Sequence, residues 1–209
     1  MSGANAVRCA AVTHYFSADS PDLVDPGEIE VLLRGRRVRV TTDRGVFSGD
    51  RLDPGTAVLL ETVPEPPSGT LLDLGCGWGP IAIALAQAAP GARVIGVDVN
   101  PRALTLTARN ARATGCAVEV ADPDALLAAE PDLALDAIWS NPPIRIGKEP
   151  LHAMLRTWLP RLADDGVAHL VVSKNLGGDS LQRWIHDDLD MEVERVASRK
   201  GFRVLRVTR

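Results

Sequence analysis

From Thr70 onward, short runs of apolar residues alternate with longer stretches in which apolar positions recur every three or four residues. The runs have the length of buried strands, and the spacing in the longer stretches is that of helices. Regular alternation of the two patterns predicts an α/β fold in which helices cover both faces of a parallel sheet. The expected strands are 70–74, 92–97, 117–120, 134–140 and 167–173, and the expected helices are 80–89, 101–114, 149–162 and 180–188.

The end of the chain carries a different pattern, in which a turn joins two apolar segments. Residues 192–197 and 202–207 flank Arg199-Lys200-Gly201, a sequence typical of a tight connection. Such a hairpin is antiparallel and can close one edge of a parallel sheet. The expected sheet is therefore seven-stranded and mostly parallel, with an antiparallel C-terminal hairpin.

The first 67 residues do not follow the alternating pattern. Two short strands, 29–33 and 38–42, flank a turn at Arg34-Gly35-Arg36, and a short helix is expected at 56–63. The proline-rich segment 64–69 then forms a stiff connector. We therefore expect an N-terminal extension, residues 1–67, packed on a core domain of residues 68–209.

Composition narrows the choice of partners. With 23 Lys and Arg against 27 Asp and Glu, the net charge is −4, so RNA contact would have to come from local basic patches. The three cysteines are widely spaced and the N-terminus lacks a secretory signal, which predicts a cytoplasmic location. The four histidines show no metal-ligand spacing, and no apolar run is long enough to span a membrane. Neither a metal nor a membrane is expected.

The strongest chemical signal is the glycine-rich segment 72–80, which follows the first core strand and opens a helix. Gly75, Gly77 and Gly79 allow the backbone to pass close under a ligand, and the helix N-terminus offers free amide donors. The spacing GxGxG, with Asp73 two positions before it, differs from the GxGxxG of dinucleotide-binding enzymes. We expect these four residues to bind a cofactor, although a glycine loop alone also fits a plain tight turn.

Acidic residues end the next two strands. Asp98 lies about 20 residues beyond the glycine loop, where a carboxylate can accept hydrogen bonds from both hydroxyls of a ribose. The alternative role, a helix cap, fits Asn100 better because a proline follows it. Asp98 and the adjacent Val99 are therefore expected in the cofactor site. Asp122 either meets an adenine amino group or caps a short helix that begins at the next residue.

The fourth strand ends in Asn141-Pro142-Pro143-Ile144, at the edge of the sheet where α/β proteins bind ligands. The prolines fix their φ angles and hold the loop open. Asn141 offers a side-chain carbonyl and Pro142 a main-chain carbonyl, and two such acceptors suit a planar exocyclic NH2. They turn the nitrogen lone pair toward a methyl donor and stabilise the positive charge that develops. The motif therefore predicts methyl transfer to a planar amine nitrogen.

Together these motifs resemble the small-domain class I methyltransferases, the group that contains bacterial ribosomal RNA guanine-N2 methyltransferases of the RsmC type. The resemblance covers most of the chain and extends to His14-Tyr15-Phe16-Ser17, Gly45–Ser48, Leu52–Thr56, 141–147 and Lys174–Gly177. It implies a Rossmann-like class I methyltransferase fold and S-adenosylmethionine (SAM) as the cofactor. Ribosomal RNA or a ribosomal subunit is the implied partner.

The resemblance also assigns residues. It places Phe47 and Ser48 near the methionine part of the cofactor, and it gives the segment Asn141–Ile144 the task of holding the target base. The longest relatives carry an additional N-terminal domain of similar fold, whereas this chain has a short extension. Many relatives have Phe or Tyr where this chain has Ile144. An aliphatic residue there weakens base stacking, a contribution of about 1–3 kcal/mol.

Basic side chains near the proposed site are candidates for RNA contact: Arg145, Lys148, Lys174, Arg199, Lys200 and Arg203. Three other functions compete with RNA methylation. A protein-glutamine N5-methyltransferase also presents an amide nitrogen to such a loop, but that family usually has Tyr after the two prolines and a helical N-terminal domain. A small-molecule N-methyltransferase fits the acidic net charge. A non-catalytic binding protein with this fold is disfavoured by the intact Asp98 and Asn141.

Overall fold

The computed structural model describes residues 23–46, 48, 50–143 and 147–209. Its strands are β1 (Pro26–Leu33), β2 (Arg36–Asp43), β3 (Thr70–Leu74), β4 (Arg93–Val97), β5 (Glu119–Ala121), β6 (Leu135–Ser140), β7 (Leu162–Ser173), β8 (Glu192–Arg199) and β9 (Phe202–Thr208). Its α-helices are α1 (Pro54–Thr62), α2 (Pro80–Ala88), α3 (Pro101–Ala113), α4 (Pro123–Ala129), α5 (Lys148–Trp158) and α6 (Gly178–Leu189). Short 3-10 helices occupy Leu159–Arg161 and Lys174–Leu176.

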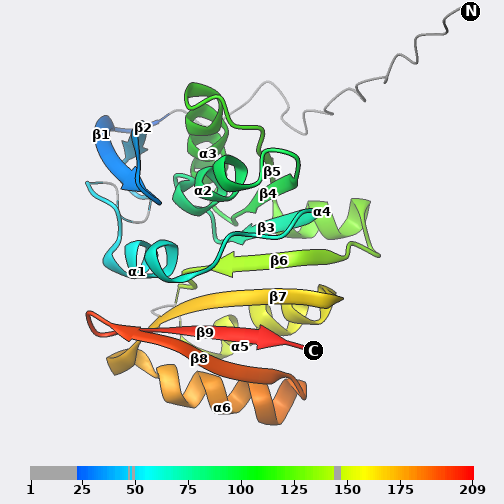
Figure 1. The fold of residues 1–209 in the computed structure, drawn as a ribbon. Coiled ribbons are helices and arrows are strands. Elements are labelled where there is room, and N and C mark those ends of the chain that lie inside the picture. The colour runs from blue at the N-terminus through cyan, green and yellow to red at the C-terminus, as the bar shows by residue number, and fades with distance from the viewer. Residues whose placement is uncertain (1–22, 47, 49, 144–146) are drawn as a thin grey trace, which may run out of the picture.

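The main sheet has the strand order β5-β4-β3-β6-β7-β9-β8 (Figure 1). Strands β3 to β7 pair in parallel, and β7–β9 and β8–β9 pair antiparallel. The expected seven-stranded, mostly parallel sheet with an antiparallel C-terminal hairpin is confirmed. Because β3, β4, β5 and β6 run in the same direction, their carboxyl ends meet along one edge, and the segments that follow them lie there together.

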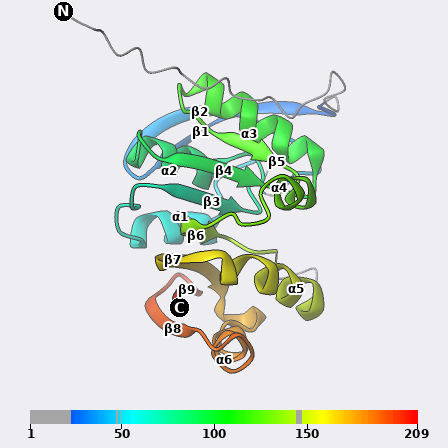
Figure 2. The same ribbon diagram turned by 90° about the vertical axis from the view of Figure 1, so that its right-hand side faces the viewer.

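Helices cover both faces of the sheet, and an apolar core fills each layer (Figures 1 and 2). Successive side chains of β3 point to opposite faces, so Leu71 belongs to one core and Leu72 and Leu74 to the other. Helices α1, α2 and α3 supply the first core, whereas α4, α5 and α6 supply the second. Proline occupies the first position of α1 to α4, where its fixed φ angle suits a helix start.

The N-terminal hairpin of β1 and β2 forms a separate two-stranded sheet. Arg34 and Gly35 at its turn have φ angles of 46° and 82°, the backbone conformation of a type I′ turn, which matches the twist of paired strands. Val38 and Val40 of β2 are buried in the first core, and β2 packs against α3. The extension and the main sheet therefore share one apolar core.

The structure differs from the sequence prediction most clearly at β7. The helix expected over 149–162 ends at Trp158, and β7 begins at Leu162, five residues earlier than expected. Its pairing with β6 shifts register between the pairs Leu135–Leu162 and Ala137–Val167, which leaves Asp164 and Asp165 exposed on an excursion of the strand. Because this irregular part of the strand is polar, the apolar pattern of the sequence did not reveal where β7 begins.

In the part of the chain that the structure describes, no helix is both long and apolar enough to cross a membrane.

Candidate active site

The glycine loop between β3 and α2 makes a sharp turn. Gly75, Gly77 and Gly79 have φ angles of 81°, 59° and 92°, in the left-handed region that favours glycine. None of the residues that the structure describes would lie within 4 Å of a Cβ atom added at Gly75 or Gly77, so the backbone of the loop borders space that these residues leave open. At Gly79 the same atom would press on Thr107 of α3 at 3.1 Å, so this glycine is needed for packing.

Asp98 connects the glycine loop to the end of β4. Its Oδ2 accepts the N–H of Gly77 at 3.0 Å, and its Oδ1 accepts the N–H of Asn100 at 2.9 Å. Asn100 caps α3 by accepting the N–H of Arg102, as its place before a proline predicts. Val99 between them is 82% exposed, an unusual state for a large apolar side chain. This edge thus presents a carboxylate and an apolar surface beside the loop.

Asp73 lies beneath the loop and does not line the cavity. Its side chain is completely buried, and its Oδ2 accepts the N–H of Ala82 at 2.8 Å, which fastens the start of α2 to β3. Burial raises the pKa of this carboxyl to about 8, because the charged form is poorly solvated there. The structure places Asp73 as a support of the loop.

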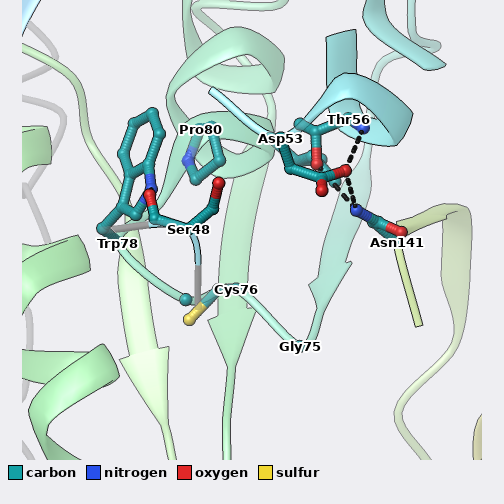
Figure 3. Close-up of a pocket in the computed structure, with 10 residues that line it drawn as sticks. Ser48, Asp53, Thr56, Gly75, Cys76, Trp78, Pro80 and Asn141 are labelled. Carbon is teal, nitrogen blue, oxygen red and sulfur yellow. Dashed lines mark hydrogen bonds between the residues drawn. The ribbon is translucent and has the colours of Figure 1, made fainter. Parts of the chain in front are cut away.

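Asn141 is held by two residues of the N-terminal extension. Its Nδ2 donates to Oδ1 of Asp53 at 2.7 Å and to Oγ1 of Thr56 at 3.0 Å (Figure 3). The preceding residue, Ser140, donates its hydroxyl to the carbonyl of Leu74 at 2.6 Å, which joins the ends of β6 and β3. Figure 3 shows the side-chain oxygen of Asn141 pointing away from Asp53 and Thr56.

One cavity is lined by residues from three parts of the chain. It has about 330 Å³ of empty space, including the part open to solvent, and it is lined by Ser48, Asp53, Thr56, Gly75, Cys76, Gly77, Trp78, Pro80, Ile81 and Asn141 (Figure 3). The extension, the glycine loop and the end of β6 each contribute to its wall. Sequence reasoning assigned no role to Asp53 and Thr56. Both residues lie in the segment Leu52–Thr56, which resembles a stretch of the family. That resemblance does not indicate a contact with Asn141.

Two further hydrogen-bond groups tie the extension to the glycine loop. Trp78 donates its indole N–H to the carbonyl of Ser48 at 3.2 Å. Asn110 of α3 accepts the N–H of Thr41 through Oδ1 and donates through Nδ2 to the carbonyls of Thr41 and Trp78, each at 2.8 Å. Asn110 is buried, and both the nitrogen and the oxygen of its amide have hydrogen-bond partners. It therefore fixes strand β2 and the glycine loop relative to each other.

The other expected site residues fall into three groups. Asp122 caps α4 by accepting the N–H groups of Asp124 and Ala125 through Oδ1, so the capping alternative is the one the structure shows. Pro142 is buried and Pro143 exposed at the end of β6. Phe47, Ile144 and Arg145 lie outside the described residues.

The candidate RNA-contacting residues divide by burial. Lys148 and Lys174 are exposed. Arg199 and Lys200 at the β8–β9 turn are about half exposed and pair with Glu61 of α1 at 3.5 and 3.7 Å. Arg203 is a correction to the prediction, because its side chain is 7% exposed and forms an ion pair with Asp179 of α6. It lies in the interior and is withdrawn from the RNA-contacting set.

The fold and this cavity define a methyltransferase. The family model for the methyltransferase small domain matches residues 37–206, and the chain belongs to that family. The predicted class of enzyme, and with it SAM as the cofactor, are thereby confirmed.

Individual relatives are similar to different extents. The uncharacterized protein YbxB of Bacillus subtilis is 31% identical over 195 residues, which cover 92% of this chain and 96% of that protein. Ribosomal RNA small subunit methyltransferase C of Shewanella amazonensis is 45% identical over 146 residues, covering 68% of this chain and 42% of that protein. The same-named protein of Hahella chejuensis is 45% identical over 103 residues, covering 49% and 30%.

A solved structure shows the same fold. It is the T. thermophilus 16S rRNA N2 G1207 methyltransferase (RsmC) in complex with AdoMet and guanosine, with a TM-score of 0.76 and 24% identity. The match covers 90% of this chain and 51% of that one. The present chain thus spans about half or less of the length of these ribosomal RNA methyltransferases.

Proposed function

We propose that this protein transfers a methyl group from SAM to an exocyclic amine, with guanine N2 of ribosomal RNA as the target. One observation carries the proposal. The amide nitrogen of Asn141 donates to two acceptors, Asp53 and Thr56, so we assign the side-chain oxygen to the substrate. A carbonyl oxygen accepts hydrogen bonds, and an NH2 group is the matching donor.

The chemistry of the target follows from that oxygen. The lone pair of an exocyclic amine is delocalised into its ring, so it is a weak nucleophile until the nitrogen becomes pyramidal. Acceptance of the amine hydrogens by Asn141 and by the carbonyl of Pro142 favours that change and stabilises the positive charge on nitrogen. The buried Pro142 and the bond from Ser140 to Leu74 hold the two acceptors in place.

The cofactor side needs binding and orientation. Bound SAM supplies a methyl group on a positively charged sulfur, a leaving group that is already activated. Gly75 and Gly77 leave room for the cofactor, and Asp98 can accept hydrogen bonds from its ribose. Val99 offers an apolar contact for adenine. The chain needs no nucleophile of its own, because the nitrogen of the substrate amine is the nucleophile that accepts the methyl group.

The choice of ribosomal RNA rests on relatives and on local charge. Similar proteins are named ribosomal RNA small subunit methyltransferases, and the solved neighbour binds guanosine. Lys148, Lys174, Arg199 and Lys200 are exposed cations that could bind phosphates despite the net charge of −4. A ribosomal substrate also implies a cytoplasmic location.

The test is a survey of substrates with isotope-labelled SAM. Small and large ribosomal subunits, naked ribosomal RNA, release factor and a metabolite pool are incubated separately, and labelled RNA is digested to nucleosides for mass spectrometry. We expect label in N2-methylguanosine, and an initial rate about 10²–10³-fold lower when Asn141→Ala replaces the wild type at equal concentration. Label in glutamine of the release factor, or in a metabolite alone, would reject the RNA assignment and keep the methyltransferase.

A further inference from the structure

The amide of Asn141 is oriented from a distant part of the sequence. Its two partners precede it by 88 and 85 residues and belong to the start of α1 in the N-terminal extension. An asparagine amide can otherwise rotate about its last side-chain bond and exchange the places of its oxygen and nitrogen. The carboxylate of Asp53 opposes that exchange, because a reversed amide would direct its oxygen at a group that has no proton to donate, and Thr56 supplies a second acceptor for the nitrogen.

Asp53 is itself held rigidly. Its Oδ1 also accepts the N–H groups of Gly55 at 2.7 Å and Thr56 at 3.0 Å, so the same oxygen caps α1 and receives Asn141. A Cβ atom at Gly55 would lie 2.9 Å from that oxygen and 2.9 Å from the ring of Phe202, so the turn closes tightly around Asp53. Thr56 is also closely packed, because it is only 3% exposed.

The charge of Asp53 adds an electronic effect. A carboxylate that accepts an N–H of an amide polarises it, and the carbonyl oxygen at the other end gains negative charge. This oxygen is the one that faces the substrate amine in the proposed function. An uncharged acceptor at position 53 would orient Asn141 but polarise it less.

We propose that Asp53 and Thr56 are positioning residues for methyl transfer, which fix the Asn141 amide so that its oxygen is presented to the target amine. The inference rests on the proposed function for its consequence in catalysis, and on the two hydrogen bonds for its geometry. It gives α1 of the N-terminal extension a role in the reaction.

Three threonine variants separate positioning from folding. Thr56→Val removes the acceptor and keeps the shape, and Thr56→Ser restores a hydroxyl. Thr62→Val is the matched control, because Thr62 lies in the same helix and its buried Oγ1 has no hydrogen-bond partner among the residues that the structure describes. We expect Thr56→Val to lower kcat about fivefold to tenfold, the effect of one lost hydrogen bond. KM and the Kd for SAM should stay within twofold, Thr56→Ser should recover most of kcat, and Thr62→Val should match the wild type.

A second readout does not depend on turnover. The chain has five asparagines, so labelling with ¹⁵N-asparagine gives five side-chain amide pairs in an NMR spectrum, and the pair of Asn141 is identified by its loss in Asn141→Ala. In the wild type, both Asn141 protons should lie downfield of those of the exposed Asn175 and should exchange more slowly with solvent. One of them should move upfield in Thr56→Val.

The outcomes distinguish the two proposals. If Thr56→Val has the kcat of Thr62→Val, or if the Asn141 amide signals resemble those of Asn175 in the wild type, Asp53 and Thr56 do not position Asn141. Methylation of guanine N2 would survive that result. If instead the wild type methylates no RNA while the Asn141 amide is fixed as described, the target is wrong and the positioning pair stands.

Discussion

Asp98→Ala should weaken SAM binding by one to two orders of magnitude. A carboxylate has about four acceptor sites on its two oxygens. In the structure, Gly77 occupies a site on Oδ2 and Asn100 a site on Oδ1. Each oxygen therefore keeps an acceptor site, which matches the two hydroxyls of a ribose. The net loss of two charge-assisted bonds, after water takes their place, corresponds to about 1.4–2.8 kcal/mol, or about 10- to 100-fold in Kd.

Calorimetry with two ligands tests the assignment to ribose. SAM and S-adenosylhomocysteine share the ribose and differ in the charge on sulfur. If Asp98 binds ribose, Asp98→Ala should weaken both ligands by the same factor. Asp98→Asn, which keeps one oxygen but no charge, should lie between the wild type and Asp98→Ala. A loss confined to SAM would mean that Asp98 acts on the positive sulfur and that the ribose assignment is mistaken.

The control must account for damage to the loop, because Asp98 also holds two backbone amides. Asn100→Ala removes the neighbouring cap of α3, a change that costs about 1 kcal/mol of stability, without removing a ribose acceptor. We expect its affinity for SAM to stay within about threefold of the wild type. If Asn100→Ala and Asp98→Ala lose the same affinity, distortion of the loop explains both and the direct contact is refuted.

Three further predictions follow from other parts of the site and the core. Asn141→Ala should keep the Kd for SAM near normal but lower kcat by about 10²–10³, as when one preorganised polar contact to a transition state is removed. Single-turnover kinetics measures this loss, and a normal kcat together with lost SAM binding would contradict the prediction. Arg199→Glu should raise KM for RNA and reduce the salt dependence of binding by about one unit of slope, whereas an unchanged slope would remove this residue from the phosphate contacts. Burial lowers the pKa of His169 to about 4 from an ordinary value near 6.5, so the unfolded chain binds more protons between these pH values and stability falls as pH drops through that window. Between pH 7.5 and 4.5 the wild type should lose about 2–3 kcal/mol more in urea unfolding than His169→Phe, and equal losses would contradict the assignment.

Much of the architecture could be predicted because local signals coincide with it. Prolines mark the starts of α2 and α3, and short apolar runs mark the core strands. The parallel direction of β3, β4 and β6 then brings the glycine loop, Asp98 and Asn141 to one edge of the sheet, with no knowledge of their distances. The site residues that follow core strands are predictable for this topological reason.

The hydrogen bonds of Asn141 to Asp53 and Thr56 were not predictable in the same way. They join segments 88 and 85 residues apart, and no period or spacing in one sequence connects such distant positions. Asp53 and Thr56 read locally as a cap and a residue in the first turn of a helix, which they also are. Their second role depends on how α1 packs on the main sheet, and packing is a property of the tertiary structure.

Arg203 shows the opposite case, in which the sequence held the answer. In β9, Arg203 shares a strand face with Leu205 and Val207, which belong to the core covered by α6. The alternation therefore predicts that Arg203 points inward, and Asp179 places an opposite charge beside it. A prediction from charge and proximity to a turn gave the wrong result because it did not apply the two-residue period.

The division of the chain at residue 67 describes its sequence pattern better than its function. Residues 68–209 supply the glycine loop and Asn141, but the amide of Asn141 depends on α1 for its orientation. The extension also covers the first apolar core, through Val38 and Val40, and binds the glycine loop through Asn110. Without the extension, that core would face water and the Asn141 amide would be free to turn. In the proposed function, the N-terminal extension thus acts by limiting the orientations of the Asn141 amide that meets the substrate.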